Sequence, residues 1–384
     1  MEENDHFGRF IVYNKIMNNS IENKILMNSP YLEIDLGKIR HNAKTISRLC
    51  QSHGIDVVGV TKGVSGMPQV AQAMLDGGVC ALADARIRNI DRMRKGGIEA
   101  EIMMLRLPRI SSAAEVARKA DDSMNSEPHV IRSLVDESRR LGKPHGIIYM
   151  VDVGDLREGV LYTRALEDVA HILAMDGIVF KGIGTNVGCF GGVLPTRENM
   201  QILARTARKI RQKYSAVCSV VSVGGTNCLP LIRQGAMPPE ISQIRIGEGI
   251  LLGRDSSCNG LVEDTYQDAF RLTAEIVEIK EKPSVPIGKI GRDAFGNVPV
   301  FINRGMRRRA LISLGKQDVQ LAGLIPEDKS IRVLGGSSDY FILDISECER
   351  DYALGDNVHF QLTYPGLLSV TTSPYVSVYF RGPQ

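Results

Sequence analysis

Eight short apolar runs recur along the first two thirds of the chain, and each ends in a polar or glycine-bearing residue. Helical stretches separate most of them, so strand and helix alternate about eight times. Each parallel crossover needs a helix and eight parallel strands can close on themselves, so the pattern predicts an α/β fold, a (β/α)8 TIM-type barrel. The runs are DVVGVTKG (56–63), VCALADA (79–85), EIMMLR (101–106), DSMNS (122–126), GIIYMVDVG (146–154), VFKGIGTNVG (179–188), CSVVSVGG (218–225) and SQIRIGEGILLG (242–253).

The same pattern predicts where the domains begin and end. YLEIDLGKIRHNAKTISRLCQSHG, from Tyr31, indicates a strand followed by an amphipathic helix, and the barrel is expected over residues 31–256. The segments at 257–384 are short, rich in β-branched residues and cut by Gly and Pro turns. They predict a C-terminal all-β domain of about six to eight strands, with no helix longer than a turn. Residues 1–30 are polar and Asn-rich, and predict an N-terminal arm, either frayed or packed as a strand on the β-domain.

Composition and charge narrow the class of protein. The 384 residues are 43% hydrophobic and 24% charged, as in an ordinary globular protein with room for two domains. A net charge of +3 is too small to indicate nucleic acid or a membrane surface as a partner. The basic run RGMRRR at 304–309 lies beside the strand-like ALISLG and predicts a solvated hairpin face. With no apolar stretch of membrane-spanning length and no signal-peptide pattern, the protein is expected to be cytoplasmic.

The cysteines indicate neither a disulfide framework nor a zinc site, because the seven form no CxxC pair. No metal is therefore expected. Cys80 and Cys218 lie in apolar strand segments and are expected in the core. Cys189, just past the sixth strand, lies where chemistry could occur.

Active sites of such barrels lie where the strands end at their C-terminal edge. A set of cations, amides and hydroxyls converging on one rim suits an anionic cofactor better than a packed core. The residues at these ends are Lys62, Asp84, Arg106, Asn125, Arg157, Asn186, Thr226 and Arg245.

Lys62 is the most informative of these residues. A lysine within a run as apolar as VVGVTKG is costly to bury unless it is neutral or paired, because desolvation lowers the pKa of an ammonium group. A lysine that forms a Schiff base needs that property. The alternative is a lysine at a strand end that extends to water. Arg157 and Arg245 also allow two interpretations: each is either a functional cation or one partner of an ion pair at the barrel rim.

Two glycine-bearing turns end the last two strands, SVGGT (222–226) and RIGEG (245–249). Exposed backbone amides in such turns favour a phosphate group, and in barrels of this kind phosphate commonly lies after strands seven and eight. The position of the turns, more than the Gly-Gly pair itself, supports a phosphate site here.

Six segments in this order, YLEIDLGKIRHNAKTI, VVGVTKG, MVDVGDLREG, GIGTNVGC, SVGGTNC and IRIGEGILLG, resemble the alanine-racemase-type (fold type III) pyridoxal-phosphate enzymes. Within that family the chain is most similar to the ornithine racemase branch, through MMLRLP, DSMNSE, IVEIKEKPSVPIGKIGRDAFGN, VLGGSSDY and TSPYV. The resemblance spans about residues 31–378. It implies a pyridoxal 5'-phosphate-dependent amino acid racemase. It also implies a homodimer whose active sites are completed by the partner's β-domain.

The resemblance also implies roles for individual residues. Lys62 binds the cofactor covalently and moves the Cα proton, Arg245 lies against the pyridine nitrogen, and Arg157 lies near the phenolic oxygen and the substrate carboxylate. An arginine at the pyridine nitrogen makes the cofactor a milder electron sink, which favours racemisation over transamination. The other cofactor-binding positions that we expect are Asn186, Gly225, Thr226, Gly247, Glu248 and Tyr364.

Three departures from the family pattern leave questions open. Met150 stands where alanine racemases carry a lysine that supports the arginine, so Arg157 needs another partner, Asp155 or Glu158. Asn186 replaces a histidine. Alanine racemases supply a tyrosine from the partner's β-domain as second base, and the corresponding position in this chain falls near Ile290. The second base is therefore unassigned. Asp293 is the nearest candidate, followed by Cys189 and Tyr364, but Asp293 is equally expected as a turn-forming aspartate before AFGN.

The substrate is expected to be ornithine or another basic amino acid, which needs an anion for its distal ammonium group. Asp339 and Asp84 are the first candidates, and Glu158 and Glu248 are also available. The alternatives are an alanine or broad-specificity racemase, a fold type III decarboxylase or D-amino acid aldolase or lyase, and a non-catalytic carrier of the cofactor. SSDY (337–340) lacks the residues of the decarboxylases and aldolases, and the second domain argues against the carrier.

Overall fold

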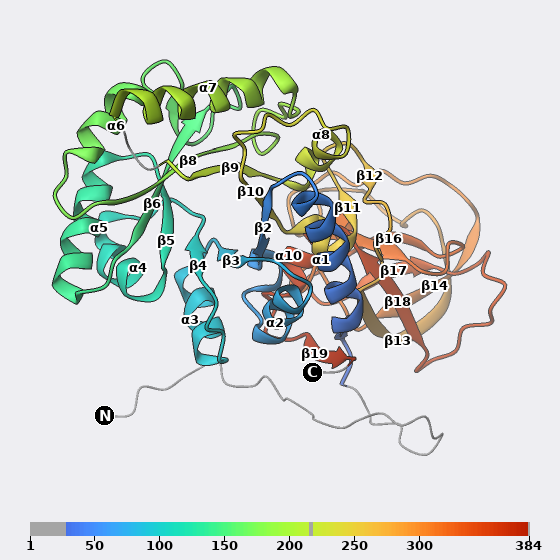
Figure 1. The fold of residues 1–384 in the computed structure, drawn as a ribbon. Coiled ribbons are helices and arrows are strands. Elements are labelled where there is room, and N and C mark those ends of the chain that lie inside the picture. Colours follow the sequence, from blue (N-terminus) through green and yellow to red (C-terminus); the bar gives the residue numbers. More distant parts are fainter. Residues whose placement is uncertain (1–27, 215–217, 383–384) are drawn as a thin grey trace, which may run out of the picture. The chain divides into compact units, whose positions relative to one another are not determined.

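The computed structural model describes residues 28–214 and 218–382, so most of the predicted N-terminal arm lies outside the described residues. The chain forms two compact units (Figure 1). Leu36–Gln267 form the barrel unit. Residues 28–35 and Asp268–Gly382 form the β unit.

The barrel unit is built on eight parallel strands, one in each of the eight predicted runs (Figure 1). The cycle runs β2-β3-β4-β5-β6-β8-β9-β10, and the pairing of β10 with β2 closes it. The predicted TIM-type barrel is thereby confirmed. The strands are β2 (Asp56–Val60), β3 (Ala81–Asp84), β4 (Ile102–Met104), β5 (Asp122–Asn125), β6 (Gly146–Asp152), β8 (Val179–Asn186), β9 (Val220–Gly224) and β10 (Gln243–Ile246).

Helices alternate with these strands and bury one face each. In the first helix the buried side chains include Leu36, Ile39, Ala43 and Ile46, which recur at the spacing of an amphipathic helix. A short strand, β7 (Val160–Leu161), extends the end of β6, and β11 (Arg254–Asp255) pairs with β12 (Gly260–Leu261). The helices are α1 (Leu36–Gln51), α2 (Pro68–Asp76), α3 (Ile87–Lys95), α4 (Ala113–Lys119), α5 (Pro128–Leu141), α6 (Ala165–Leu173), α7 (Arg197–Tyr214), α8 (Leu229–Arg233) and α9 (Glu248–Leu252).

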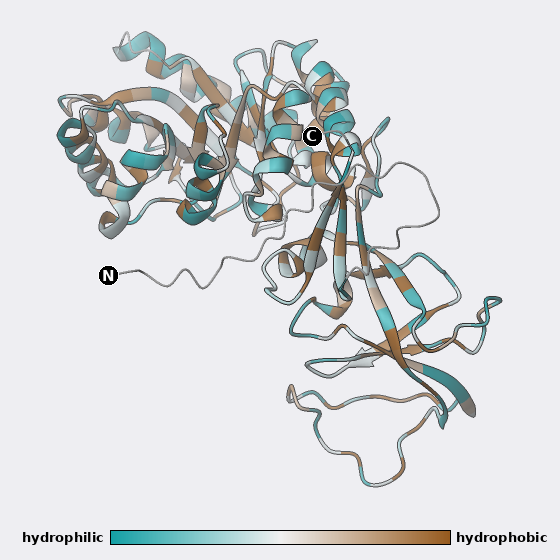
Figure 2. Ribbon diagram, turned by 90° about the horizontal axis from the view of Figure 1, so that it is seen from below, coloured by the Kyte–Doolittle hydropathy of each residue, from teal (hydrophilic) through white to brown (hydrophobic). Residues whose placement is uncertain are grey.

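Apolar side chains fill the barrel interior. Val58, Ala83, Met124, Ile148 and Met150 belong to one buried cluster drawn from neighbouring strands. The strands are accordingly coloured largely as hydrophobic, whereas the helices carry much hydrophilic colour (Figure 2). Met150 is fully buried there, so its position contributes packing and no charge.

The N-terminal end of the barrel carries a cluster of charges around a buried histidine. Lys181 Nζ lies 2.8 Å from an Asp122 oxygen, and Lys143 Nζ lies 3.2 Å from Asp121. His145 Nε2 lies 2.7 Å from the Ser123 hydroxyl, and burial lowers the pKa of His145 to about 4. This end of the barrel therefore holds a neutral imidazole beneath paired charges.

The β unit is one eight-stranded sheet. The segment predicted to begin the barrel, β1 (Tyr31–Asp35), belongs to this sheet, where Tyr31 pairs with Thr273 antiparallel and with Ser377 parallel. The remaining strands confirm the predicted all-β C-terminal part. They are β13 (Phe270–Pro283), β14 (Met306–Ile312), β15 (Leu324–Pro326), β16 (Arg332–Gly336), β17 (Phe341–Asp344), β18 (Asn357–Leu362) and β19 (Ser377–Arg381).

Two smaller expectations were wrong. The β unit contains α10 (Tyr364–Val370), a seven-residue helix that is longer than one turn. Thr363 caps this helix, because its side chain accepts a hydrogen bond from the Gly366 N–H, and Pro365 suits the first turn. Cys80 is exposed rather than part of the core, whereas Cys218 is buried as expected.

Within the described ranges, no helix combines the length and the apolar character that crossing a membrane requires. The same ranges contain no group of three or more His, Cys, Asp or Glu side chains that could hold a metal ion.

Candidate active site

The ends of β8, β9 and β10 meet at a buried arginine. Arg245 is 4% exposed, and its guanidinium donates to the Ser222 hydroxyl, the Thr185 carbonyl at 2.7 Å and Asn186 Oδ1 at 2.7 Å. Burial lowers the pKa of Arg245 to about 10, and the negative charge of Glu158 opposes that shift. At neutral pH this side chain is a desolvated cation at the mouth of an otherwise apolar barrel.

Gly224 is required for this arrangement. A Cβ at Gly224 would lie 2.0 Å from Asn186 Oδ1 and 2.8 Å from Arg245 Nη2. The first glycine of the Gly-Gly turn therefore makes room for side chains from the two neighbouring strands.

A chain of hydrogen bonds continues from Asn186 across the mouth. Asn186 Nδ2 donates to Glu158 Oε1, and the Arg157 guanidinium donates to Glu158 Oε2 at 2.6 Å. The partner left open for Arg157 is therefore Glu158. We call Arg157, Glu158, Asn186, Arg245 and Ser222 the mouth network.

Asp155, the other candidate partner, has a different role. It is 1% exposed, and its carboxylate accepts hydrogen bonds from the backbone N–H groups of residues 188–191, at 3.1–3.3 Å. These bonds join the loop after β6 to the loop after β8. They also hold Cys189, whose side chain is exposed, in a defined place near the end of β8.

Lys62 begins a short 3-10 turn directly after β2. Its side chain is exposed although Val58 and Val60 before it are buried, so of the two alternatives the structure favours a lysine at a strand end that extends to water. The strand ends at Val60 and Lys62 lies in the turn that follows, so the apolar run does not enclose it. Ser65 closes the turn in the left-handed region, with φ 51°.

Asp84 stabilises this turn through buried hydrogen bonds. It is fully buried, and its oxygens accept from the Thr61 hydroxyl at 2.7 Å, the Arg86 N–H at 2.9 Å and Asn89 Nδ2 at 2.9 Å. Burial raises the pKa of this carboxyl. With both oxygens engaged by protein donors, Asp84 holds the backbone that carries Lys62, and the geometry does not favour the predicted contact with a substrate.

The turns after β9 and β10 approach each other closely. Gly225 has φ 106°, Thr226 is buried, and Thr226 Oγ1 accepts the Gly249 N–H at 2.9 Å. A Cβ at Gly249 would lie 2.7 Å from Thr226 Cγ2, so glycine is needed for this close approach. We call Gly225, Thr226, Gly247 and the backbone of Glu248 the glycine cradle.

The Glu248 side chain does not enter the cradle as a free carboxylate. It accepts hydrogen bonds from the Ser256 hydroxyl and, at 3.3 Å, from the Ser256 N–H. The resemblance implied a role for the backbone of Glu248 at the phosphate, and that role stays a prediction.

Two rim residues lie apart from these groups. Asn125 is 1% exposed and donates to the Ser123 hydroxyl at 2.9 Å, and Arg106 is exposed after β4. No hydrogen bond among the described residues connects either one with the mouth network.

Comparison with known proteins identifies the family to which this barrel belongs. Residues 34–254 match the N-terminal domain of alanine racemase. The chain is 43% identical over 347 residues to lysine racemase of Thermotoga maritima, covering 90% of this chain and 97% of that protein. It is 36% identical over 348 residues to ornithine racemase of Acetoanaerobium sticklandii, covering 90% and 98%. The chain belongs to the alanine racemase family. It is accordingly a racemase, as the sequence motifs predicted.

Solved structures share the fold at low sequence identity. Alanine racemase from Streptomyces lavendulae has a TM-score of 0.72 at 17% identity, covering 92% of this chain and 97% of that one. D-threonine aldolase from Filomicrobium marinum has a TM-score of 0.70 at 15% identity, covering 90% and 89%. Likeness at this level shows the fold alone, because one fold hosts several reactions.

The β unit of this racemase holds the remaining candidates. Asp293 Oδ1 accepts the N–H groups of Phe295 at 2.9 Å and Asn297 at 2.8 Å, and the bonds from Asn297 are the main reason that its pKa is lowered. These are the contacts of a turn-forming aspartate. Asp339 is exposed beside the Ser338 hydroxyl, which donates to it at 2.5 Å, and Tyr364 is the first residue of α10.

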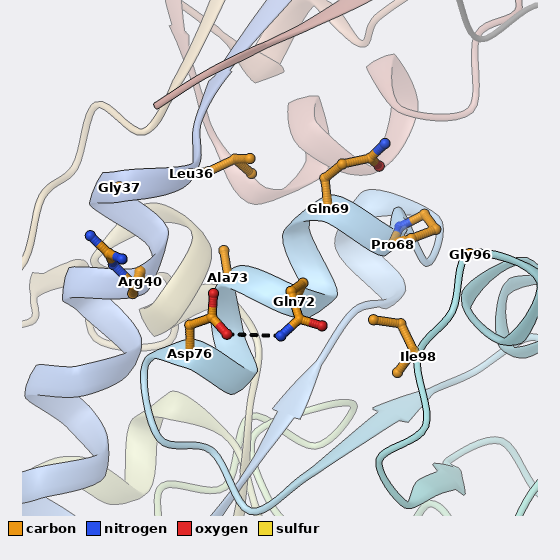
Figure 3. Close-up of a pocket in the computed structure, with 10 residues that line it drawn as sticks. All are labelled: Leu36, Gly37, Arg40, Pro68, Gln69, Gln72, Ala73, Asp76, Gly96 and Ile98. Atoms are coloured by element: carbon orange, nitrogen blue, oxygen red, sulfur yellow. Dashed lines mark hydrogen bonds between the residues drawn. The ribbon is translucent and has the colours of Figure 1, made fainter. Parts of the chain in front are cut away.

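A cavity of about 270 Å³ lies elsewhere in the racemase barrel, between α1, α2 and the segment after α3 (Figure 3). Arg40 and Gln72 line it, and Gln72 donates to Asp76 at 2.8 Å (Figure 3). None of the predicted site residues lines this cavity. It lies against the helices, not at the C-terminal ends of the strands where active sites of such barrels lie.

Sequence reasoning missed Ser222 and the supporting roles of Thr61 and Asp155. Ser222 stands two residues before Gly224 on the same face of β9, and Gln243, which accepts from the Ser222 hydroxyl at 2.7 Å, stands two before Arg245. This period of two was the available signal that polar residues continue inward from the rim.

Proposed function

We propose that this chain is a pyridoxal 5'-phosphate-dependent racemase that interconverts the L- and D-enantiomers of a basic amino acid, ornithine or lysine. The observation that carries the proposal is the mouth network, in which Arg157 binds the Glu158 carboxylate directly and Arg245 is connected to it through Asn186. Lys62 and the glycine cradle are carried by neighbouring strands of the same barrel. The lysine and ornithine racemases that resemble the chain over 90% of its length support a basic substrate.

The residues at the mouth fit this cofactor. The glycine cradle offers a hydroxyl and backbone N–H groups at the start of α9, and side chains on its glycines would meet neighbouring atoms. Arg245 supplies a fixed cation for the pyridine nitrogen, and Lys62 supplies an exposed amine for covalent attachment. When bound, the cofactor acidifies the Cα–H of an amino acid joined to it.

The chain's own groups then direct the proton. Lys62, on a turn fixed by Thr61 and Asp84, takes and returns the Cα proton on one face. Arg157 holds the substrate carboxylate. Arg245 remains protonated near pH 7, which disfavours a proton on the ring nitrogen and therefore favours return of the proton to Cα.

The acid on the opposite face is best assigned to Cys189 among the three candidates. Asp293 accepts two backbone N–H bonds and has a lowered pKa, so it is held as a carboxylate and is a poor proton donor. Cys189 is exposed on a loop that Asp155 fixes three residues beyond Asn186. Tyr364 stays as the third candidate.

The group that binds the distal ammonium of the substrate is expected outside the barrel unit. The rim carboxylates Asp84, Asp155, Glu158 and Glu248 all accept hydrogen bonds from barrel groups. Asp339 in the β unit is exposed, and we propose that the Asp339 of a partner subunit serves this purpose.

A homodimer is consistent with the β unit's loop between β13 and β14. Ile287, Val300 and Ile302 on that loop are 93%, 89% and 68% exposed. Apolar side chains concentrated in this way favour burial against another protein surface.

The decisive experiment is an enantiomer-resolved screen of the twenty amino acids plus ornithine, with pyridoxal phosphate present. Ornithine or lysine should racemise fastest, from either enantiomer. A preference for alanine, or release of carbon dioxide or an aldehyde in place of racemisation, would contradict the proposal.

A further inference from the structure

We propose that Glu158 is a positioning residue that holds Arg157 in place and couples it, through Asn186, to Arg245. The inference deepens the proposed function and rests on it, since Arg157 is taken to bind the substrate carboxylate. The connection is direct, because each of the two Glu158 oxygens accepts from a different partner, Arg157 or Asn186.

Burial makes this carboxylate more than a surface ion pair. The Glu158 side chain is 14% exposed, and that of Arg157 is 36% exposed. An ion pair in partly dry surroundings is screened less by water and salt than one in bulk solvent. Asn186 connects this ion pair to Arg245, because its amide oxygen accepts from Arg245 at 2.7 Å while its amide nitrogen donates to Glu158.

The charges of the mouth network require an anion at this position. Glu158 is the charge that most raises the pKa of Arg245, and Arg157 acts against it. Met150 is buried among apolar side chains and supplies no charge. Glutamine at position 158 could still accept from Asn186. Its amide would present N–H groups toward the Arg157 guanidinium, which has only donors.

Backbone hydrogen bonds fix the loop that carries Arg157 and Glu158. Asp152 Oδ1 accepts the N–H groups of Gly154 at 2.7 Å and Leu156 at 3.3 Å, and Asp155 is tied to the loop after β8. Gly159 has φ 109°, and a Cβ there would lie 2.9 Å from the Met150 carbonyl oxygen. A loop held at both ends in this way presets the ion pair before substrate arrives.

The test compares Glu158→Gln and Glu158→Asp with Glu167→Gln, which removes an exposed carboxylate on α6 outside the network. We expect Glu158→Gln to raise KM for the preferred amino acid by about tenfold or more, with a smaller change in kcat. Glu158→Asp should recover part of that loss, because it restores the charge. Glu167→Gln should match the wild type.

A second measurement is independent of activity. Calorimetric titration of pyridoxal phosphate into the apoprotein should show weaker binding for Glu158→Gln than for Glu167→Gln, with melting temperatures close to that of the wild type. Wild-type KM and wild-type cofactor binding in Glu158→Gln would overturn the inference. The inference would also be overturned if Glu158→Asp lost as much activity and cofactor affinity as Glu158→Gln and both variants melted at a lower temperature than the wild type.

The two proposals fail in different ways. If the wild type racemises no amino acid, the proposed function fails, and the titration still tests whether Glu158 positions the arginines. If the wild type racemises a basic amino acid and Glu158→Gln is unchanged, only the role of Glu158 fails.

Discussion

The two ends of the barrel use charge in opposite ways. At the N-terminal end, Arg94, Lys143 and Lys181 lie within ion-pair distance of Asp121, Asp122 or Glu101. In the mouth network, Arg157 pairs with Glu158, and Arg245 is connected to the same carboxylate only through Asn186. The charges of the N-terminal end are paired, whereas the mouth network itself holds two arginines and one carboxylate, which suits an anionic ligand. This difference supports the proposal that the mouth network is the active site.

The largest effect is expected from Lys62→Ala at the mouth. Racemisation should be abolished, because no other amine on the strand end can take and return the proton. Stability should change by less than about 1 kcal/mol, since the side chain is exposed. A chiral assay, a thermal melt and mass spectrometry after borohydride reduction check this. A variant that still forms a reducible adduct at wild-type stoichiometry would remove Lys62 from the mechanism.

The N-terminal end should instead control stability in acid. Burial lowers the pKa of His145 from 6.5 to about 4, so between those values the unfolded chain binds more protons than the folded one. The contribution of His145 is full above pH 6.5 and is lost as pH falls toward 4, a change on the order of 3 kcal/mol.

Urea unfolding from pH 7.5 to 4.5 measures this change. His145→Asn should flatten the pH dependence, and His129→Asn, which alters an exposed histidine on α5, should leave it as in the wild type. Equal slopes for all three proteins would show that the buried imidazole does not set acid stability.

Gly224→Ala tests the crowding of the mouth network. The added methyl group would overlap Asn186 Oδ1, so the amide or the arginine must move. We expect a loss of stability of about 1–3 kcal/mol and a fall in kcat/KM of at least about tenfold. Gly260→Ala is the control, because the nearest neighbour of a Cβ there is the Cys258 side chain, with its Sγ at 3.1 Å. If both variants behave alike, the close packing at Gly224 has no functional role.

The smallest effect concerns selectivity. Asp339→Asn should raise KM for ornithine or lysine by about tenfold, while a neutral amino acid of similar length is nearly unaffected, since one charge-assisted hydrogen bond is lost. Steady-state kinetics with matched substrates measure this. An equal change for both substrates would mean that another group recognises the distal ammonium.

Much of the architecture could be predicted from local patterns. Short apolar runs located all eight barrel strands, and the rule that active sites lie at the strand ends identified Lys62, Arg157 and Arg245 as candidates. The glycine-bearing turns after β9 and β10 were found in the same way. These features depend on neighbours within a few residues, so the sequence alone determines them.

What only the tertiary structure decided is which distant groups meet. Tyr31 pairs with residues more than two hundred positions away, so strand periodicity could not assign β1 to the β unit. Asp84 also ends a strand, yet its oxygens accept from Thr61, Arg86 and Asn89 and support the Lys62 turn. Asp155 is engaged by the loop after β8, which leaves the neighbouring Glu158 to bind Arg157. The meeting of those two loops follows from closure of the barrel, which, unlike a strand's periodicity, is a property of the whole chain.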